Sequence, residues 1–184
     1  MSIEKYTTEA IILNIYDQGE NDRVYKMFTY EFGLVMAHGK SIRKLESKLR
    51  SHLMVGRTVL VTLVKGREVW RITGATDISD KNVFLHEIAS VLNRFIQGEG
   101  AHKNLYKNLI SISKNFASFD KTKAKLLIYF VVLVDLGYAD HKMIGSRDVK
   151  EYFSFDVNDL YTHLLLNYEN IKKHVSLVIE DTHL

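Results

Sequence analysis

The residues whose side chains are best suited to bind a ligand are nine lysines and arginines between positions 38 and 71. This segment of 34 residues holds only two acids, Glu46 and Glu68, so its formal charge is +7, whereas the whole chain carries +3. A concentrated positive face binds polyanions, most often nucleic acid. The candidate DNA-binding residues are therefore Lys40, Arg43, Lys44, Lys48, Arg50, Arg57, Lys65, Arg67 and Arg71.

The chemistry expected of these side chains is neutralisation of phosphates, which releases counterions and makes binding depend steeply on salt. Five of them lie in a stretch that is expected to be a flexible connector and to follow a nucleic-acid backbone: Lys40, Arg43, Lys44, Lys48 and Arg50. The other four lie on or beside expected strands, so some of them are expected to face another way.

Catalytic and metal-binding chemistry has no comparable support. The chain has no cysteine, which excludes disulfides, zinc–thiolate sites and cysteine nucleophiles, and its eight histidines lack the H-x-x-x-H spacing of a helical metal site. Gly39-Lys40-Ser41 resembles the end of a phosphate-binding loop, but the first glycine of that pattern would fall at Leu34. We therefore expect no enzyme, no cofactor and no metal site.

The elements that must position the basic residues are short strands. Apolar and polar residues alternate over 10–16, 23–30, 34–37, 58–64 and 68–74, and turn residues such as Gly19 and Gly33 separate these runs. The basic connector, residues 40–52, joins the third run to the fourth. Five short strands without a regular helix predict a small β-barrel.

From about residue 79 the apolar spacing becomes helical. It predicts one helix through Phe84 to Phe95, a second through Leu105 to Phe116, and a third from Asp120 to Gly137 that is apolar nearly all round. After a mixed stretch over 138–155, Asp156 is expected to cap a single last helix with Leu160, Leu164, Ile171, Val175 and Val178 facing inward. The sequence therefore predicts two domains, 1–79 and 80–184.

The distribution of apolar residues indicates the cellular location of the chain. The longest apolar run, Leu126 to Val134, is far shorter than the roughly 20 residues that span a bilayer. The N-terminal residues are polar, unlike a signal peptide. The expected location is therefore the cytoplasm, with no membrane partner. Residues 1–79 carry a net charge of +3, whereas residues 80–184 are neutral.

An ordered set of short motifs resembles the RecO family. In chain order these motifs are Thr8-Glu9-Ala10-Ile11-Ile12-Leu13, Gly19-Glu20-Asn21-Asp22-Arg23, Thr29-Tyr30-Glu31-Phe32-Gly33, Gly39-Lys40-Ser41-Ile42-Arg43-Lys44 with Lys48-Leu49-Arg50, and Leu136-Gly137-Tyr138. The similarity covers residues 3–79 well and the helical half loosely.

The resemblance implies an N-terminal OB-fold, a five-stranded barrel, followed by an all-helical C-terminal domain. It also implies binding of single- and double-stranded DNA, annealing of complementary strands, and the loading of RecA onto DNA coated by single-strand binding protein. The implied partners are RecR and the tail of single-strand binding protein. Many members carry cysteine zinc ligands after the L-G-Y helix, where this chain reads Ala139 to Ile144 without cysteine.

Aromatic residues receive no base-stacking assignment. Tyr25, Phe28, Tyr30, Phe32 and Trp70 are candidates by location, but rings in strands are usually core, and Trp70 is expected to face the barrel interior with Ile72.

Two other functions fit the sequence. One is an OB-fold RNA-binding module, and the other is a protein-interaction adaptor whose basic segment contacts an acidic partner.

The Asp22 and Arg23 pair is expected to be structural, tying its turn to the barrel.

Overall fold

The computed structural model describes residues 4–67, 69–78, 85–138 and 156–181. The chain divides into two compact units, residues 1–103 and residues 104–184. The predicted boundary after residue 79 falls at the end of the last strand, and the first helix after it belongs to the first unit. The division into domains 1–79 and 80–184 stays a prediction.

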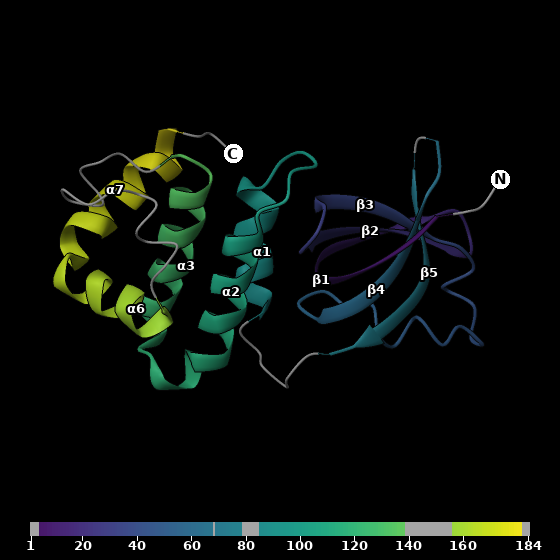
Figure 1. Ribbon diagram of the computed structural model, residues 1–184, viewed down its shortest axis with the longest axis horizontal. Helices are drawn as coiled ribbons and strands as arrows, with labels where there is room; N and C mark the ends of the chain where they lie inside the picture. Colours follow the sequence, from purple (N-terminus) through teal and green to yellow (C-terminus); the bar gives the residue numbers. More distant parts are fainter. Residues whose placement is uncertain (1–3, 68, 79–84, 139–155, 182–184) are drawn as a thin grey trace. The chain divides into compact units, whose positions relative to one another are not determined.

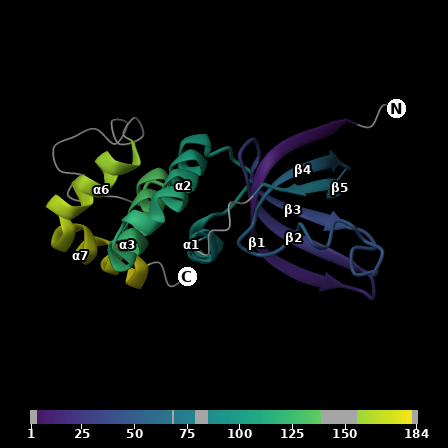
Figure 2. The same cartoon turned by 90° about the horizontal axis from the view of Figure 1, so that it is seen from below.

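The first unit contains a closed five-stranded barrel in the order β1-β2-β3-β5-β4 (Figures 1 and 2). Neighbouring strands pair antiparallel except β3 and β5, which run parallel over two register pairs. This is the predicted fold class, an OB-type barrel followed by helices, and it is confirmed. The strands are β1 (Lys5–Gln18), β2 (Asp22–Thr29), β3 (Gly33–Gly39), β4 (Thr58–Lys65) and β5 (Trp70–Asp77).

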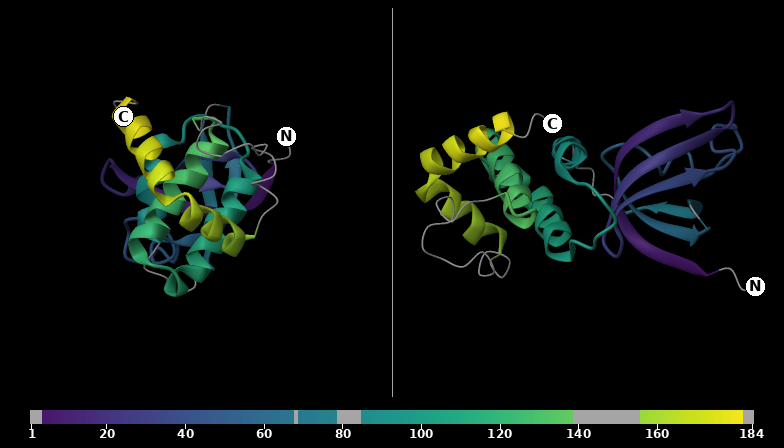
Figure 3. Two further views of the ribbon diagram at one scale, coloured as in Figure 1. Left: turned by 90° about the vertical axis from the view of Figure 1, so that its left-hand side faces the viewer. Right: turned by 90° about the horizontal axis from the view of Figure 1, so that it is seen from above.

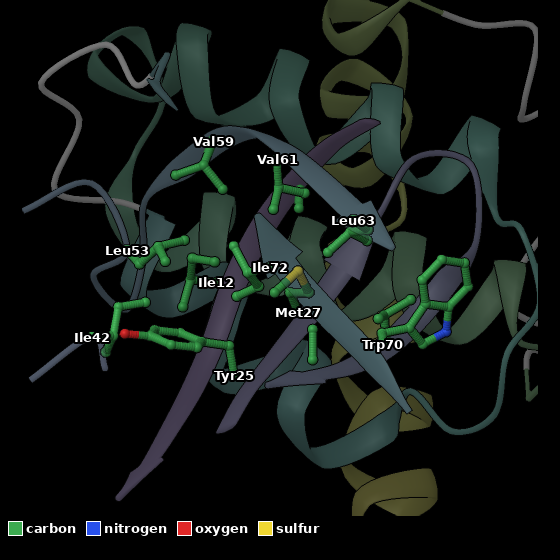
Figure 4. Close-up of a cluster of buried hydrophobic side chains, with 13 residues drawn as sticks. Ile12, Tyr25, Met27, Ile42, Leu53, Val59, Val61, Leu63, Trp70 and Ile72 are labelled. Carbon is green, nitrogen blue, oxygen red and sulfur yellow. The ribbon is translucent and has the colours of Figure 1, made fainter. Parts of the chain in front are cut away.

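Side-chain alternation builds the barrel core. Tyr25 and Met27 on β2 point inward with Ile12 on β1 and Leu63 on β4, and all four are fully buried (Figure 4). The strand period of two puts every second residue on this inner face. Trp70 and Ile72 also lie in this core, as predicted. Val24, Lys26 and Phe28 alternate with Tyr25 and Met27 and therefore face outward.

The turn before β3 requires glycine. Gly33 has φ of +66°, and a Cβ placed there would overlap the backbone of Gly100, above all its carbonyl oxygen. The segment after the first helix therefore passes directly over this turn. Thr29 supports the same turn, because its hydroxyl donates to the Gly33 carbonyl and accepts from the Phe32 amide.

The outer side of β1 is also covered. Ile11 and Leu13 point away from the barrel interior and are nevertheless buried, and helix α1 (Leu85–Phe95) packs against this strand. The buried residues of α1 include Ile88, Leu92 and Phe95, which is the predicted apolar face; Phe84, predicted for the same face, lies outside the described residues.

The second unit is helical in its described part. Figure 3 shows α6 and α7 lying against α3, which has eight buried residues and begins, as predicted, at the cap Asp120. The elements are α2 (Lys103–Asn115), whose first residue belongs to the first unit, a 3-10 turn (Phe116–Ser118), α3 (Lys121–Asp135), α6 (Val157–Leu166) and α7 (Tyr168–Asp181).

The prediction of a single last helix is wrong, although its cap Asp156 is correct. The helix ends at Asn167, whose φ of −120° leaves the helical range, and α7 begins at the next residue. The side chain of Asn167 caps this end, because its amide donates to the carbonyl of His163, which also accepts the last helical bond from the Asn167 backbone N–H. Leu160 to Val175 keep one helical period across the break, so the apolar spacing did not reveal it.

The mixed stretch 139–155, which includes the position of the family's zinc ligands, lies outside the described residues. Among the residues that are described, no helix is long and apolar enough to cross a membrane. In the same ranges, no three His, Cys, Asp or Glu side chains come together as a metal site.

Candidate nucleic-acid interface

The segment between β3 and β4, residues 40–57, contains turns but neither a helix nor a strand, so the basic connector is longer than the predicted residues 40–52 and the name refers to 40–57 from here on. It is nevertheless anchored, because Ile42 and Leu53 are buried in the barrel core, where the Tyr25 ring points toward Ile42 (Figure 4). The backbone of Gly56 and Arg57 also bonds to Ile12 on β1. The connector is therefore a fixed surface over one part of the barrel, which differs from the flexible segment that the sequence predicted.

The start of the connector has an unusual backbone. Ser41 has φ of +54°, the left-handed region that side chains seldom occupy, and its N–H donates to the Asp22 carboxylate at 2.7 Å. Asp22 therefore holds the turn that begins the connector. This turn follows a strand and leads into further turns, so Gly39-Lys40-Ser41 lacks the helix of a phosphate-binding loop.

Three of the nine predicted basic residues are paired with acids. Arg43 lies 3.6 Å from Asp17 and donates to the carbonyl of Gly19, whereas Arg57 donates to Asp77 at 3.1 Å. Lys65 lies 3.7 Å from Glu99 and also sits over the ring of Trp70, 5.0 Å from its centroid. These three cations are partly neutralised before any ligand binds.

The other six candidates form no ion pair with any residue that the structure describes, and all six are exposed. Four of them follow one another along the connector, and two belong to the hairpin between β4 and β5 and to β5 itself. They are Lys40, Lys44, Lys48, Arg50, Arg67 and Arg71.

The pairing of β3 with β5 brings the start of the connector next to Arg71 on β5. Arg71 on β5 pairs with His38 on β3, and both side chains face outward because their neighbours Trp70 and Ala37 face inward. His38 lies two residues before Lys40. The start of the connector therefore lies next to the outer side of β5. We use the name connector face for the exposed, unpaired cations of the connector together with Arg71: Lys40, Lys44, Lys48, Arg50 and Arg71.

Arg23 is a basic residue that the sequence analysis did not place in the site. It lies on β2 opposite Gly39, donates to Asp17 at 2.8 Å, and is three-quarters buried. Its pairing with Asp17 rather than Asp22 ties the turn to the barrel, so the expected structural role holds with a different partner. Only the register of β2 and β3 brings Arg23 to the connector, and one sequence does not reveal that register.

Asp17 is the acid that shapes the local charge. The hydrogen bond from Arg23 holds the pKa of Asp17 below its ordinary value, and the nearby charge of Arg43 acts in the same direction. The same bond raises the pKa of Arg23. Asp17 is therefore ionised at neutral pH and reduces the net positive charge at this end of the connector.

An open depression of about 530 Å³ lies between the connector and the ends of β1 and β2. Its lining combines two guanidinium groups, two hydroxyl groups and apolar side chains, and none of its described lining residues is acidic. Six of these residues are Arg23, Arg50, Ser47, Ser51, Leu45 and Met54.

The aromatic candidates do not form an exposed stacking surface. Tyr25, Phe28 and Trp70 are buried, and Phe32 packs edge-on or tilted against Tyr6 and Trp70 at the barrel end. Among the described aromatic residues of the first unit, Tyr16 is the exposed one, at 44%. The leading interactions at this surface are therefore electrostatic.

Known proteins resemble the part of the chain that carries this surface. Residues 1–80 match the family described as Recombination protein O N terminal. A DNA repair protein RecO from Dehalococcoides mccartyi is 37% identical over 73 residues, which are 40% of this chain and 29% of that protein. A DNA repair protein RecO from Chloroherpeton thalassium is 25% identical over 136 residues, 68% of this chain and 52% of that protein. The matches thus span about half the length of these relatives or less.

Proposed function

We propose that the chain, whose residues 1–80 match the N-terminal part of the RecO family, is a non-enzymatic, cytoplasmic DNA-binding mediator of recombinational repair. The observation that carries the proposal is the connector face, where five exposed cations have no ion pair among the described residues. Phosphates are the ligands that such a row of cations attracts, and backbone contacts alone read no base sequence.

The mechanism that we propose is electrostatic. The connector face holds the phosphates of a strand, single or double, through contacts that salt weakens. Such contacts allow a bound strand to slide until complementary bases meet. Neutralised phosphates also repel a second strand less, which favours annealing.

The partners proposed here follow from the family. RecR and the tail of single-strand binding protein are the proposed protein partners, with loading of RecA as the outcome. The net-neutral residues 80–184 are the proposed source of protein-contact surfaces. Lys121, Lys123 and Lys125 at the start of α3 are candidates for an acidic tail.

The first test is binding of single-stranded DNA measured by fluorescence anisotropy at several salt concentrations. The variant Lys40→Ala/Lys44→Ala/Lys48→Ala removes three unpaired cations from the connector face. We expect about tenfold weaker binding at low salt and a salt slope that is smaller by about 2, since each lost single-strand phosphate contact removes roughly 0.7.

The matched control removes the same charge elsewhere. Lys114, Lys121 and Lys173 are exposed lysines of the second unit, and their combined replacement by alanine is expected to leave the salt slope unchanged. An equal loss in both variants would show that total charge, not the connector face, governs binding.

The two alternative functions give different results in the same assay. An RNA-binding module would bind RNA oligomers more tightly than matched DNA oligomers. A protein-interaction adaptor would show no salt-dependent affinity for either nucleic acid, and that outcome would contradict the proposal.

A further inference from the structure

The depression beside the connector has a composition that phosphate binding does not explain. Leu45 is 94% exposed and Met54 is 50% exposed, although both are large apolar side chains. They lie beside Arg50, one of the five cations of the connector face. Simple electrostatic attachment to a backbone needs no apolar surface at this place.

The chemistry of the lining defines its ligand. The guanidinium of Arg50 favours an anion, whereas that of Arg23 is already paired with Asp17, and the apolar side chains favour a flat or apolar group next to that anion. The hydroxyls of Ser47 and Ser51 offer both donors and acceptors. Ser51 donates to the carbonyl of Lys48 at 3.3 Å, so its oxygen remains able to accept. A nucleotide carries groups of these kinds: a phosphate, a flat ring and a polar ring edge.

The size and position also fit one nucleotide. Ligand pockets have volumes of roughly 300–1,000 Å³, and the depression, about 530 Å³, lies in this range. A phosphate backbone that follows Lys44 and Lys48 passes the rim of the depression, because Leu45, Ser47, Arg50 and Ser51 belong to the same stretch of chain. A base reaches the depression from this backbone only when it is unpaired and unstacked.

We infer that the depression accepts one unpaired base of a bound strand, so that the connector face holds single-stranded DNA more tightly than duplex DNA. This inference rests on the proposed function, since the phosphates must bind first. It adds a contact that depends on the base and is independent of salt. An acidic peptide with an apolar side chain has similar charge, but Lys44 and Lys48, exposed cations that neighbour the lining residues Leu45 and Ser47 in sequence, favour a repeating polyanion.

The test compares ligands of equal charge. The full chain is titrated with a thymine oligomer, with an oligomer of the same length made of abasic deoxyribose phosphates, and with a duplex of half that length, which carries about the same number of phosphates. We expect the thymine oligomer to bind about tenfold more tightly than the abasic one, as apolar and polar base contacts each add roughly a few-fold. The salt slopes of the two single strands are expected to be equal.

The variant Leu45→Ala/Met54→Ala removes the apolar contacts from two exposed positions, so the fold is expected to survive, which a thermal melt checks. It is expected to lose most of the preference for thymine over the abasic oligomer and to keep its salt slope. The control Leu60→Ala removes an exposed apolar side chain on β4 that does not line the depression, and it should keep the preference.

The outcomes separate the two proposals. Equal binding of thymine and abasic oligomers, or an equal loss for both in the double variant, would overturn the inference while the salt slope still supports DNA binding. No binding of any oligomer at low salt would overturn the proposed function and the inference together. Capture of an acidic peptide but of no oligomer would do the same.

Discussion

At the scale of single residues, Asp17 determines how much positive charge the connector presents. Its carboxylate accepts from Arg23 at 2.8 Å and lies 3.6 Å from Arg43. The same side chain therefore stabilises the turn and reduces the attraction for phosphates. Its removal is expected to change stability and affinity in opposite directions.

The variant Asp17→Asn tests this double role. We expect a lower melting temperature at pH 7, because Arg23 loses its carboxylate partner, and DNA affinity about two- to fivefold higher at low salt, because a negative charge is removed. The control Glu20→Gln removes the same charge from the same turn, where Glu20 has no ion pair among the described residues. It should raise affinity similarly and leave the melting temperature unchanged.

The stabilising effect of Asp17 depends on pH in a defined direction. Its pKa is lowered in the folded protein by the hydrogen bond from Arg23, so its stabilisation is fully present above the unfolded pKa of about 3.9. That stabilisation is lost as the pH falls through the lowered native pKa. The difference in melting temperature between Asp17→Asn and the wild type should therefore shrink in acid; a constant difference would contradict the ion pair.

The sequence identified the cations but not their pairing. Lys40, Lys44 and Lys48 were named from local charge alone, and the structure leaves them exposed. Arg57 and Asp77 are twenty positions apart in sequence, and Lys65 and Glu99 are further apart. Such pairs depend on strand register and on the path after α1, which are tertiary properties that a local charge pattern does not contain.

At the scale of elements, two glycines with similar backbone angles have different roles. Gly19 and Gly33 have φ of +60° and +66°, so an alanine at either position is strained. A Cβ at Gly19 meets nothing within 4 Å, whereas a Cβ at Gly33 meets the backbone of Gly100. The first turn is constrained only by its own backbone, and the second by a segment far away in sequence.

These two turns give a matched pair of variants. Gly19→Ala is expected to lower the free energy of unfolding by about 1–2 kcal/mol, the cost of a left-handed residue. Gly33→Ala is expected to cost at least about 1–3 kcal/mol more, because backbone atoms must move apart. Urea denaturation measures both. Equal costs would mean that the segment around Gly100 does not pack on the turn before β3.

The helices and strands were predicted correctly where the spacing of nearby apolar residues determines them, and incorrectly where a distant partner or a cap determines them. Alternation located all five strands, and Asp120 and Asp156 were correct helix caps. The first strand proved longer than predicted, because the polar stretch Lys5 to Thr8 pairs with β4. This extension depends on a partner strand. The break at Asn167 was missed because the apolar period continues through it.

At the scale of the whole molecule, charge is divided between the two compact units. Residues 1–103 hold 15 basic and 12 acidic side chains, a net of +3, whereas residues 104–184 hold 10 of each. Attraction for a polyanion is therefore expected to come from the first unit. A neutral helical unit is better suited to contacts that do not compete with the DNA for charge.

The uneven charge of the two units predicts how separate fragments of the chain bind DNA. A fragment of residues 1–103 is expected to bind single-stranded DNA with the same salt slope as the full chain, and a fragment of residues 104–184 is expected to show none. Circular dichroism melts of both fragments establish that each is folded. A salt-dependent affinity in residues 104–184 would place phosphate contacts in the helical unit.

The barrel has one weak closure. β3 and β5 share only two register pairs, Ala37 with Trp70 and His38 with Arg71, whereas the other neighbouring strands pair over seven or more. Local opening of the barrel is expected to begin at this seam, so its amides should exchange with solvent earlier than those of β1. Lys40 and Arg71 belong to the two sides of the seam. A strand of DNA bound to both residues would therefore hold the barrel closed, and ligand binding would appear as slower amide exchange in β3 and β5.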